Sequence, residues 1–261
     1  MAEKKALVTG AAHRLGRAMA LSLAQDGFDV AVHCNHSVEA AGTLVEELRA
    51  MGRQSSVLEA DLLDEAQVET LVPRAVEALG GPLALLVNNA SIFEEDSLTS
   101  ATRQSWDRHM ESNLRAPFVL LQHFAAQACE PLMEEGERPL AQAMVINMID
   151  QRVRKLTPQF MSYTLTKSAL WTLTRTAAQA LAPKVRVNAI GPGPTLKGAR
   201  QSEADFENQQ KATLLQRGAT PEDVCAALHY LIGARSVTGQ MICPDSGQHL
   251  AWETPDVGGL E

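Results

Sequence analysis

The sequence has few aromatic residues and no long apolar run. Phe, Trp and Tyr make up 4% of the 261 residues, so an aromatic side chain in a loop beside a predicted site is informative. No stretch approaches the roughly 18 consecutive apolar residues that a membrane-spanning helix needs. The N-terminal residues lead directly into a strand pattern and lack the apolar centre of a secretion signal. We therefore expect a cytoplasmic protein with no membrane partner.

Clustered cysteines and clustered basic residues are also missing. The four cysteines are far apart and form no Cys-x-x-Cys pair: Cys34, Cys129, Cys225 and Cys243. This spacing predicts neither a zinc site nor a disulfide framework, and we expect no metal. Lys and Arg total 23 against 31 Asp and Glu, a formal net charge of -8. Without a basic run, such an acidic chain is a poor candidate for nucleic-acid binding.

What the sequence does contain is a regular alternation of short apolar runs and helical periodicity. Continuous apolar runs are typical of strands buried on both faces, in a parallel sheet covered by helices. We expect strands at about 6–8, 28–32, 56–58, 83–87, 144–146, 185–187 and 237–242, and the longest helices at 105–134 and 158–181. The prediction is an α/β fold in which residues 1–261 form a single-domain, Rossmann-type, doubly wound parallel sheet of about seven strands, with helices on both faces.

Two segments depart from this alternation. Residues 134–139 read Glu-Glu-Gly-Glu-Arg-Pro and predict a charged turn ahead of the fifth strand. Residues 191–220 are long, polar and headed by Gly and Pro, and they follow the carboxyl end of a strand. Ligands bind at that edge of open parallel sheets, so we expect residues 191–220 to form a substrate-loop flap. The alternative is a variable surface excursion.

A glycine-containing turn lies between the first strand and the first helix. Residues 9–16 read Thr-Gly-Ala-Ala-His-Arg-Leu-Gly. A turn that enters a helix N-terminus presents backbone N–H groups and the positive end of the helix dipole to a phosphate. Gly10 permits the turn, and Gly16 permits close approach of the helix to the strand or to a cofactor. The context predicts a dinucleotide-phosphate site.

The end of the second strand bears on the choice of dinucleotide. A ribose 2′-hydroxyl is usually bound by an acidic side chain there, whereas a 2′-phosphate requires donors. No Asp or Glu occurs in this segment before Glu39. The polar side chains present are His33, Asn35, His36 and Ser37. This set favours NADP(H); the alternative is that His33 and His36 merely cap the next helix.

Tyr163 and Lys167 are four residues apart in a predicted helix. That spacing places both side chains on one helix face, one turn apart. A cation beside a phenol stabilises the phenolate, so we expect Lys167 to let Tyr163 act near neutral pH, well below its ordinary pKa of about 10. The pair predicts proton transfer.

Six short motifs occur in order from residue 5 to about residue 250. They are Thr9-Gly10 with Leu15-Gly16, Asp61, Asn88-Asn89-Ala90, Asn113, Tyr163-x-x-x-Lys167 and Gly191-Pro192-Gly193. Together they resemble the short-chain dehydrogenase/reductase family. The resemblance implies that Lys167 also holds the nicotinamide ribose and that Asn113 holds a water that relays protons. It further implies cofactor contacts at Gly10, Leu15, Gly16, Asp61, Leu62, Asn89, Ala90, Ser91, Tyr163, Lys167, Pro192, Gly193 and Thr195.

Two positions depart from the usual family pattern. Arg14 stands where the family usually has a glycine, and Asp150 stands where it usually has a serine, thirteen residues before Tyr163. Both changes resemble the pteridine reductases and dihydromonapterin reductases. Phe93 resembles the phenylalanine that stacks on the pterin in that subgroup. The resemblance implies substrate contacts at Arg14, Ser91, Phe93, Asp150 and Tyr163, with Arg14 also touching the cofactor.

The chemistry of a pterin suits these side chains. Its ring nitrogens and amino-pyrimidinone edge match a carboxylate acceptor, and its flat ring gains from an aromatic face. The resemblance therefore implies NADPH-dependent hydride transfer to a (dihydro)pterin such as dihydrobiopterin, dihydromonapterin or dihydrofolate. The proton would come from Tyr163 or from water organised by Asp150. The alternatives are core packing for Phe93, a structural carboxylate for Asp150 and a surface side chain for Arg14.

Other functions stay open at this point. One is an NADPH-dependent reductase of a carbonyl or quinone, and another is a non-catalytic NADP-sensing protein. His36 occupies the place of the arginine that usually holds the 2′-phosphate in pteridine reductases. Residues 237–250 resemble the family's last strand and tail, a segment that commonly supports tetramers, so we expect a homotetramer.

Overall fold

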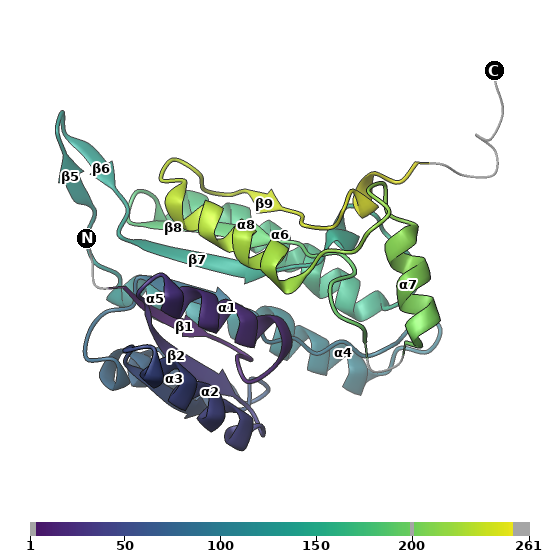
Figure 1. Ribbon diagram of the computed structural model, residues 1–261, viewed down its shortest axis with the longest axis horizontal. Helices are drawn as coiled ribbons and strands as arrows, with labels where there is room; N and C mark the ends of the chain where they lie inside the picture. Colours follow the sequence, from purple (N-terminus) through teal and green to yellow (C-terminus); the bar gives the residue numbers. More distant parts are fainter. Residues whose placement is uncertain (1–3, 199–200, 253–261) are drawn as a thin grey trace.

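The computed structural model describes residues 4–198 and 201–252. Seven parallel strands form one sheet in the order β3-β2-β1-β4-β7-β8-β9 (Figure 1). Their bounds are β1 Lys5–Val8, β2 Asp29–Cys34, β3 Ser55–Glu59, β4 Leu85–Asn88, β7 Ala143–Met148, β8 Val185–Ile190 and β9 Met241–Ile242. The chain builds outward from β1 to β3 and then returns to β4, so connections diverge between β1 and β4. In this class of sheet, ligands bind at that switch point.

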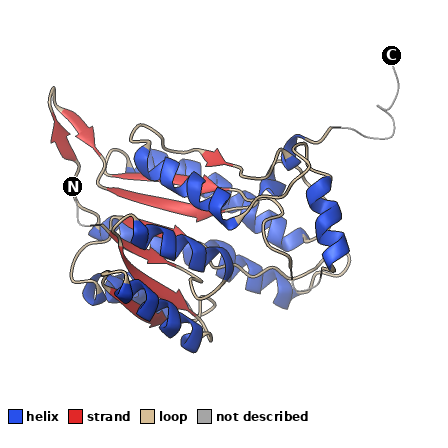
Figure 2. Ribbon diagram, in the orientation of Figure 1, coloured by secondary structure: helices blue, strands red, loops and turns tan. Residues whose placement is uncertain are grey.

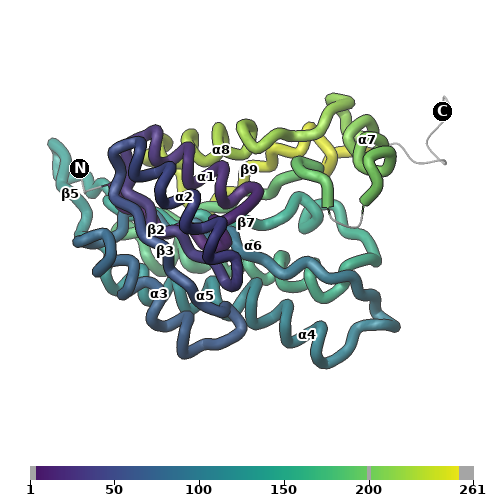
Figure 3. The backbone as a smooth tube through the Cα atoms, turned by 60° about the horizontal axis from the view of Figure 1, so that its bottom comes forward, coloured from purple at the N-terminus to yellow at the C-terminus, as the bar shows by residue number. Residues whose placement is uncertain are grey.

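Helices cover both faces of the sheet, as predicted (Figure 2). One layer contains α1 (Arg14–Gln25), α2 (Val38–Ala50) and α8 (Pro221–Gly233), and the other contains α3 (Glu65–Ala78), α5 (Ala116–Gln127) and α6 (Met161–Leu181). In Figure 3, α1 and α8 lie above the strands and α3 and α5 lie below them. Successive strand residues point to opposite faces. Ala6 and Val8 accordingly pack with the first layer, and Leu7 packs with the second.

The helix predicted at 105–134 is wrong at its C-terminal end. α4 (Arg103–Met110), the π-helical η1 (Glu111–Arg115) and α5 follow one another, and α5 ends at Gln127. The residues after it form an antiparallel hairpin of β5 (Leu132–Glu134) and β6 (Arg138–Leu140). Pro131 accounts for the difference, because a proline has no N–H for the carbonyl four residues earlier, that of Gln127, and its ring would clash with that carbonyl in a continued helix. The charged segment 134–139 forms the tip of this hairpin.

Two smaller corrections concern the ends of elements. The strand predicted at 237–242 shortens to Met241–Ile242, because Gly239 has φ +70° and breaks the extended run. The helix predicted from 158 begins at Met161. Residues 191–220 contain α7 (Glu203–Lys211), whose N-terminus is capped by the Ser202 hydroxyl. Their role as a flap stays a prediction.

The described residues contain no helix that is both long and apolar enough to cross a membrane. Within residues 4–198 and 201–252 there is also no group of three or more His, Cys, Asp or Glu side chains arranged to hold a metal ion.

Candidate active site

The turn after β1 is locked against the end of β4. The Asn89 side-chain amide donates to the carbonyls of Thr9 (2.8 Å) and Gly10 (3.2 Å), and the Thr9 hydroxyl accepts from the backbone N–H groups of Asn89 and Ala90. Gly10 has φ +60°, which favours glycine. A Cβ at Gly16 would lie 2.2 Å from the Gly10 carbonyl oxygen and 2.6 Å from the Asn89 amide nitrogen. Gly10 is therefore favoured by its backbone conformation, and Gly16 by the close approach of the Gly10 carbonyl and the Asn89 amide.

The N-terminus of α1 is suited to an anion. Its N-cap residue, His13, makes no side-chain capping bond, and the first turn has no acidic residue. The first N–H groups of a helix have no partner within the helix and carry the positive end of its dipole. Leu15 lies in this first turn. The geometry of the turn fits the phosphates of a dinucleotide.

The structure does not place His33 as the donor to a 2′-phosphate that the sequence predicted. Its ring is buried, with Nδ1 accepting from the Gly10 N–H at 3.0 Å and Nε2 3.1 Å from the Ala60 carbonyl. This pairing places the ring proton on Nε2, and burial lowers the pKa of His33 to about 4. Both ring nitrogens are engaged, so His33 supports the Gly10 turn and has no donor left for a 2′-phosphate.

The other polar residues at this edge are more accessible. The Asn35 amide donates to the Asp61 carboxylate at 3.4 Å, and Asp61 also accepts from the backbone of Leu63. His36 is exposed, and Ser37 is the N-cap of α2 without a side-chain capping bond. Leu62 is buried against the second helix layer. His36 and Ser37 are thus the accessible donors at the end of β2.

Tyr163 and Asp150 are in direct contact. Tyr163 lies in the first turn of α6, and its hydroxyl donates to Asp150 Oδ2 at 3.1 Å. Asp150 Oδ1 accepts from the Arg152 N–H at 2.8 Å, because Asp150 caps the short helix η2 (Gln151–Val153). Lys167 Nζ donates to the Met148 carbonyl at 2.8 Å and lies 5.6 Å from the centre of the Tyr163 ring.

The electrostatics of this group differ from the prediction. Burial, reinforced by the adjacent Asp150, raises the pKa of Tyr163 well above its ordinary value. Burial also raises the pKa of Asp150 and lowers that of Lys167 to about 8. The expected stabilisation of a phenolate by Lys167 is therefore outweighed, since desolvation disfavours every charged form here. At neutral pH Tyr163 is a protonated phenol, the form that donates a proton.

Three aromatic rings meet beside the phenol. The Phe93 and Phe160 rings stack with centroids 4.2 Å apart, and the Phe93 and Tyr163 rings meet edge to face at 4.7 Å. Phe93 is 44% exposed although it sits in this cluster. The structure thus places a half-exposed aromatic side chain directly beside the Tyr163 phenol. Sequence reasoning missed Phe160; an aromatic residue one turn before Tyr163, in a chain poor in aromatics, was the available signal.

Asn113 holds the loop that carries Phe93. It is fully buried in the π-helical η1, and its side chain bonds both the N–H and the carbonyl of Ile92, each at 2.8 Å. The adjacent Ser91 is exposed, and its hydroxyl lies 3.3 Å from the Ile92 carbonyl. The structure thus gives Asn113 a clamping role, and its predicted water relay stays a prediction.

Arg14 connects the turn to residues 191–220. Its guanidinium donates to the carbonyls of Leu196 (2.9 Å) and Lys197 (3.0 Å), and its backbone is left-handed, with φ 53°. A left-handed backbone is unfavourable for a side chain of this kind. Arg14 therefore reaches the beginning of the predicted flap rather than Asp150 or Phe93.

The start of residues 191–220 is packed firmly. A Cβ at Gly193 would lie 2.7 Å from Asp245, and the Pro192 carbonyl accepts from the Gln151 N–H at 3.3 Å. The buried Thr195 donates to the Gly193 carbonyl at 3.0 Å. Of the predicted cofactor residues, Pro192 thus contacts Gln151, the residue after Asp150, and Gly193 packs against Asp245.

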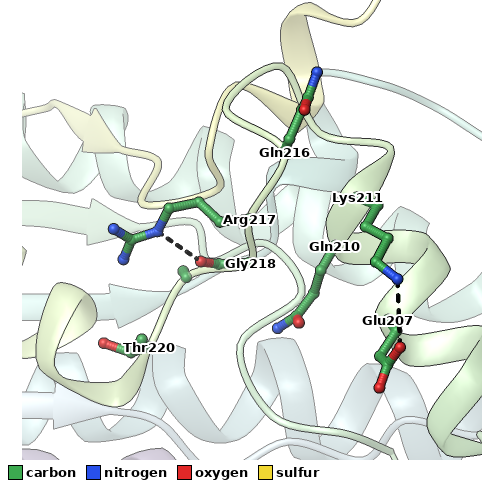
Figure 4. Close-up of a pocket in the computed structure, with 8 residues that line it drawn as sticks. Glu207, Gln210, Lys211, Gln216, Arg217, Gly218 and Thr220 are labelled. Carbon is green, nitrogen blue, oxygen red and sulfur yellow. Dashed lines mark hydrogen bonds and ion pairs between the residues drawn. The ribbon is translucent and has the colours of Figure 1, made fainter.

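A separate pocket of about 410 Å³ lies in the later part of this segment, between α7 and residues 216–220 (Figure 4). Figure 4 shows Lys211 directed at Glu207 and Arg217 directed at the Gly218 carbonyl. None of the predicted site residues lines it. The chemistry of Tyr163 and Asp150 therefore lies elsewhere.

Comparisons with known proteins agree with this geometry. The family model described as enoyl-(acyl carrier protein) reductase matches residues 10–249. The short-chain dehydrogenase/reductase eriH of Hericium erinaceus is 34% identical over 93% of this chain and 96% of its own length, and the 3-oxoacyl-[acyl-carrier-protein] reductase FabG of Staphylococcus aureus is 31% identical over 95% and 98%.

A solved structure is more similar still. FolM alternative dihydrofolate reductase 1 of Brucella suis, crystallised with NADP, is 45% identical, with a TM-score of 0.89 over 97% of this chain and 98% of that chain. The matched motifs, the fold and these similarities lead to one conclusion. The chain belongs to the short-chain dehydrogenase/reductase family.

Proposed function

We propose that this protein is an NADPH-dependent pteridine reductase. The observation that carries the proposal is the contact between the Tyr163 hydroxyl and the Asp150 carboxylate, beside the half-exposed Phe93. A carbonyl substrate is served by a neutral hydroxyl at this place. A carboxylate instead suits a heterocycle with N–H and amino groups. The similarity to FolM, whose name is that of a dihydrofolate reductase, supports the same substrate class.

The residues that would hold NADPH fit that cofactor. The phosphates would bind the turn of Gly10, Leu15 and Gly16, where the backbone approaches closely. The first N–H groups of α1 have no side-chain cap and face this turn. The adenosine half would extend toward Asn35, His36, Ser37, Asp61 and Leu62. The nicotinamide half would lie among Asn89, Ala90, Ser91, Tyr163, Lys167, Pro192, Gly193 and Thr195. When bound, NADPH supplies the hydride that reduces a C=N bond of the dihydropterin.

The chain itself supplies orientation and the proton. Phe93 offers an aromatic face to the pterin ring, and Asp150 accepts hydrogen bonds from its amino-pyrimidinone edge. Tyr163 donates the proton from its hydroxyl. Asp150 Oδ2 accepts the hydrogen bond of that hydroxyl and so fixes the position of the Tyr163 oxygen. Ser91 is a further substrate contact in this proposal, and Arg14 would act on the substrate through the flap residues Leu196 and Lys197 that it holds.

Lys167 and Asn113 complete the assignment. Lys167 Nζ, anchored on the Met148 carbonyl, would also bind the nicotinamide ribose. Its pKa of about 8 leaves it mostly protonated at neutral pH, so it retains the charge needed to attract the ribose hydroxyls. Asn113 would hold a water between Lys167 and solvent, in addition to clamping Ile92.

The decisive experiment compares substrates in two proteins. The wild-type protein and Asp150→Ser are each given NADPH with a dihydropterin, and separately with a panel of carbonyls and quinones. We expect the wild-type protein to oxidise NADPH with the dihydropterin. In Asp150→Ser, pterin turnover should fall by at least about tenfold more than carbonyl turnover. Equal losses on both substrate classes would refute the role of Asp150 in pterin recognition.

A carbonyl reductase is the second candidate. The FabG of Staphylococcus aureus, named a 3-oxoacyl-[acyl-carrier-protein] reductase, is 31% identical over nearly the whole chain. Wild-type turnover of carbonyls without turnover of dihydropterins would favour this candidate. NADPH binding without turnover on either panel would favour the sensing protein.

Cofactor preference and assembly are tested separately. Thermal unfolding with NADPH and with NADH compares the two dinucleotides, and we expect the larger stabilisation from NADPH. We also propose a homotetramer, which light scattering on the eluting protein measures directly.

A further inference from the structure

The helix that carries Tyr163 begins without a cap of its own. The residue before α6 is Phe160, which has φ 55° and makes no side-chain capping bond. The first N–H groups of a helix need acceptors from elsewhere when they are buried. Ser162, in this first turn, is fully buried. Another segment must therefore supply the acceptors.

Asp96 supplies them from 66 residues earlier in the chain. Its Oδ1 accepts from the Ser162 N–H at 3.0 Å, and its backbone carbonyl accepts from the Met161 N–H at 3.3 Å. The Ser162 hydroxyl donates a short hydrogen bond to Asp96 Oδ2. Asp96 is 3% exposed. A buried carboxylate at a helix N-terminus also interacts favourably with the helix dipole.

His109 of α4 fixes the direction of this network. Its Nε2 accepts from the Glu94 N–H at 3.2 Å, so the ring proton is on Nδ1. Nδ1 lies 2.7 Å from the Ser162 hydroxyl and donates a hydrogen bond to it, and that hydroxyl donates in turn to Asp96. The three hydrogen bonds that link the Glu94 N–H, His109, the Ser162 hydroxyl and Asp96 thus each have a defined donor and acceptor. Defined roles hold a network of this kind in one arrangement.

The network lies directly behind the reacting groups. Glu94 and Asp96 follow Phe93 in its loop, and Ser162 precedes Tyr163 in α6. The His109 and Tyr163 rings meet edge to face at 6.3 Å. We infer that Asp96 is a positioning residue, which holds the Tyr163 phenol in register with the Phe93 face by joining their two segments. Small misplacements of a proton donor cost large factors in rate.

This inference rests on the proposed role of Tyr163 as proton donor, so its test needs a signal independent of turnover. The chain has two tyrosines, and the other, Tyr230, is 57% exposed on α8. In Tyr230→Phe, all tyrosinate absorbance comes from Tyr163. Because burial keeps the pKa of Tyr163 high, this protein should show little tyrosinate at about pH 10. Adding Asp96→Ala should release the phenol toward water and produce tyrosinate at that pH, while circular dichroism reports an intact fold.

The kinetic arm uses a matched control. Asp64 also caps a helix, α3, by accepting from the Ala66 N–H at 3.0 Å, but it is not part of the site. We expect Asp96→Ala to lower kcat about 10- to 100-fold with NADPH affinity unchanged, and Asp64→Ala to leave both unchanged. Asp96→Asn keeps an oxygen for the Ser162 N–H and should recover part of kcat.

Ser162→Ala serves if Asp96→Ala fails to fold. It breaks only the side-chain relay between His109 and Asp96, and we expect a smaller fall in kcat and some tyrosinate at about pH 10 in the Tyr230→Phe background. Parent-like kcat and parent-like absorbance in the variants would overturn the inference. If the wild-type protein reduces carbonyls but no dihydropterin, the pterin proposal fails. The role of Asp96 is then tested by kcat for the carbonyl substrate and by the tyrosinate absorbance.

Discussion

The Tyr163 hydroxyl donates its hydrogen bond to the Asp150 carboxylate, 3.1 Å away. In the usual family pattern a serine stands at position 150, and a serine hydroxyl carries no negative charge near neutral pH. Here burial raises the pKa of both groups, and the adjacent Asp150 raises that of Tyr163 further, whereas the hydrogen bond from Tyr163 favours the ionised form of Asp150. In the proposed reaction the phenol gives its single proton to the substrate, and the phenolate regains a proton from solvent before the next turnover.

Tyr163→Phe should abolish most turnover without unfolding the protein. The phenylalanine ring keeps the edge-to-face contact with Phe93, whereas the proton donor is lost. We expect kcat to fall by about 10²- to 10⁴-fold, the range that general acids contribute. NADPH oxidation measures the rate, and thermal unfolding checks that the midpoint stays near that of the wild-type protein. Retention of most turnover would show that the proton comes from another group.

Gly16→Ala should destabilise the folded protein. The new Cβ would collide with the Gly10 carbonyl and the Asn89 amide, so the turn must shift. We expect a loss of about 1–3 kcal/mol in the free energy of unfolding, measured with urea, together with weaker NADPH binding. Gly42→Ala is the matched control in the interior of α2, where an added Cβ meets nothing within 4 Å. It should stabilise by roughly 0.5–1 kcal/mol, and equal effects at both positions would contradict the close-approach argument.

His33 should make stability depend on pH below neutrality. Its pKa is 6.5 in the unfolded chain and about 4 in the folded protein. Above pH 6.5 both states are neutral there and His33 contributes nothing to the pH dependence. Between 6.5 and 4 only the unfolded chain gains the proton, so the free energy of unfolding falls as the pH falls. The loss is about 2 kcal/mol at about pH 5.

The variant His33→Asn isolates this contribution. Other titrating groups act in the same pH range in both proteins, so the difference between the two urea-unfolding curves reports His33 alone. We expect the stability gap to be widest at neutral pH and to narrow toward about pH 4. His36→Asn, at an exposed position, is the control and should parallel the wild-type protein. A gap that stays constant with pH would disprove the buried, neutral imidazole.

Arg14→Ala should loosen the beginning of residues 191–220. The guanidinium bonds to the Leu196 and Lys197 carbonyls would be lost, so we expect faster amide hydrogen exchange there. Losing a cation at the phosphate turn should also raise the KM for NADPH about tenfold, with a smaller change in kcat. Arg17→Ala is the control, since Arg17 on the same helix pairs with Glu47 instead. Unchanged amide exchange in Arg14→Ala would show that Arg14 does not hold the beginning of residues 191–220 in place.

The repeating part of the fold could be predicted from the sequence. Apolar runs such as Leu7 and its neighbours pack on both sides of the sheet, and this burial on both faces is visible in the continuous apolar runs of the sequence. The hairpin at 132–140 was missed because its strands are short and exposed, with no buried face to give a pattern. Gly239 shortened the last strand through its backbone conformation, which a residue type does not reveal.

The site was predicted where spacing along one helix or one loop was sufficient. Tyr163 and Lys167 share a helix face, but their pKa directions depended on burial and on the distance to Asp150, which sequence does not give. His33 looked like a free donor because nothing in the sequence indicates that Ala60 and Gly10 lie on either side of its ring. Asp96 was missed for the same reason, since its partner Ser162 lies 66 residues away.

The single imidazole of His33 joins the ends of three neighbouring strands: the turn after β1, β2 itself and Ala60 just beyond β3. The turn proposed for the phosphates and the residue proposed for the adenine side, Asp61, are therefore parts of one rigid body. Folding has already ordered both, so a dinucleotide that engages one meets the other in place. Adenosine diphosphate alone should therefore bind this scaffold with little loss of chain entropy.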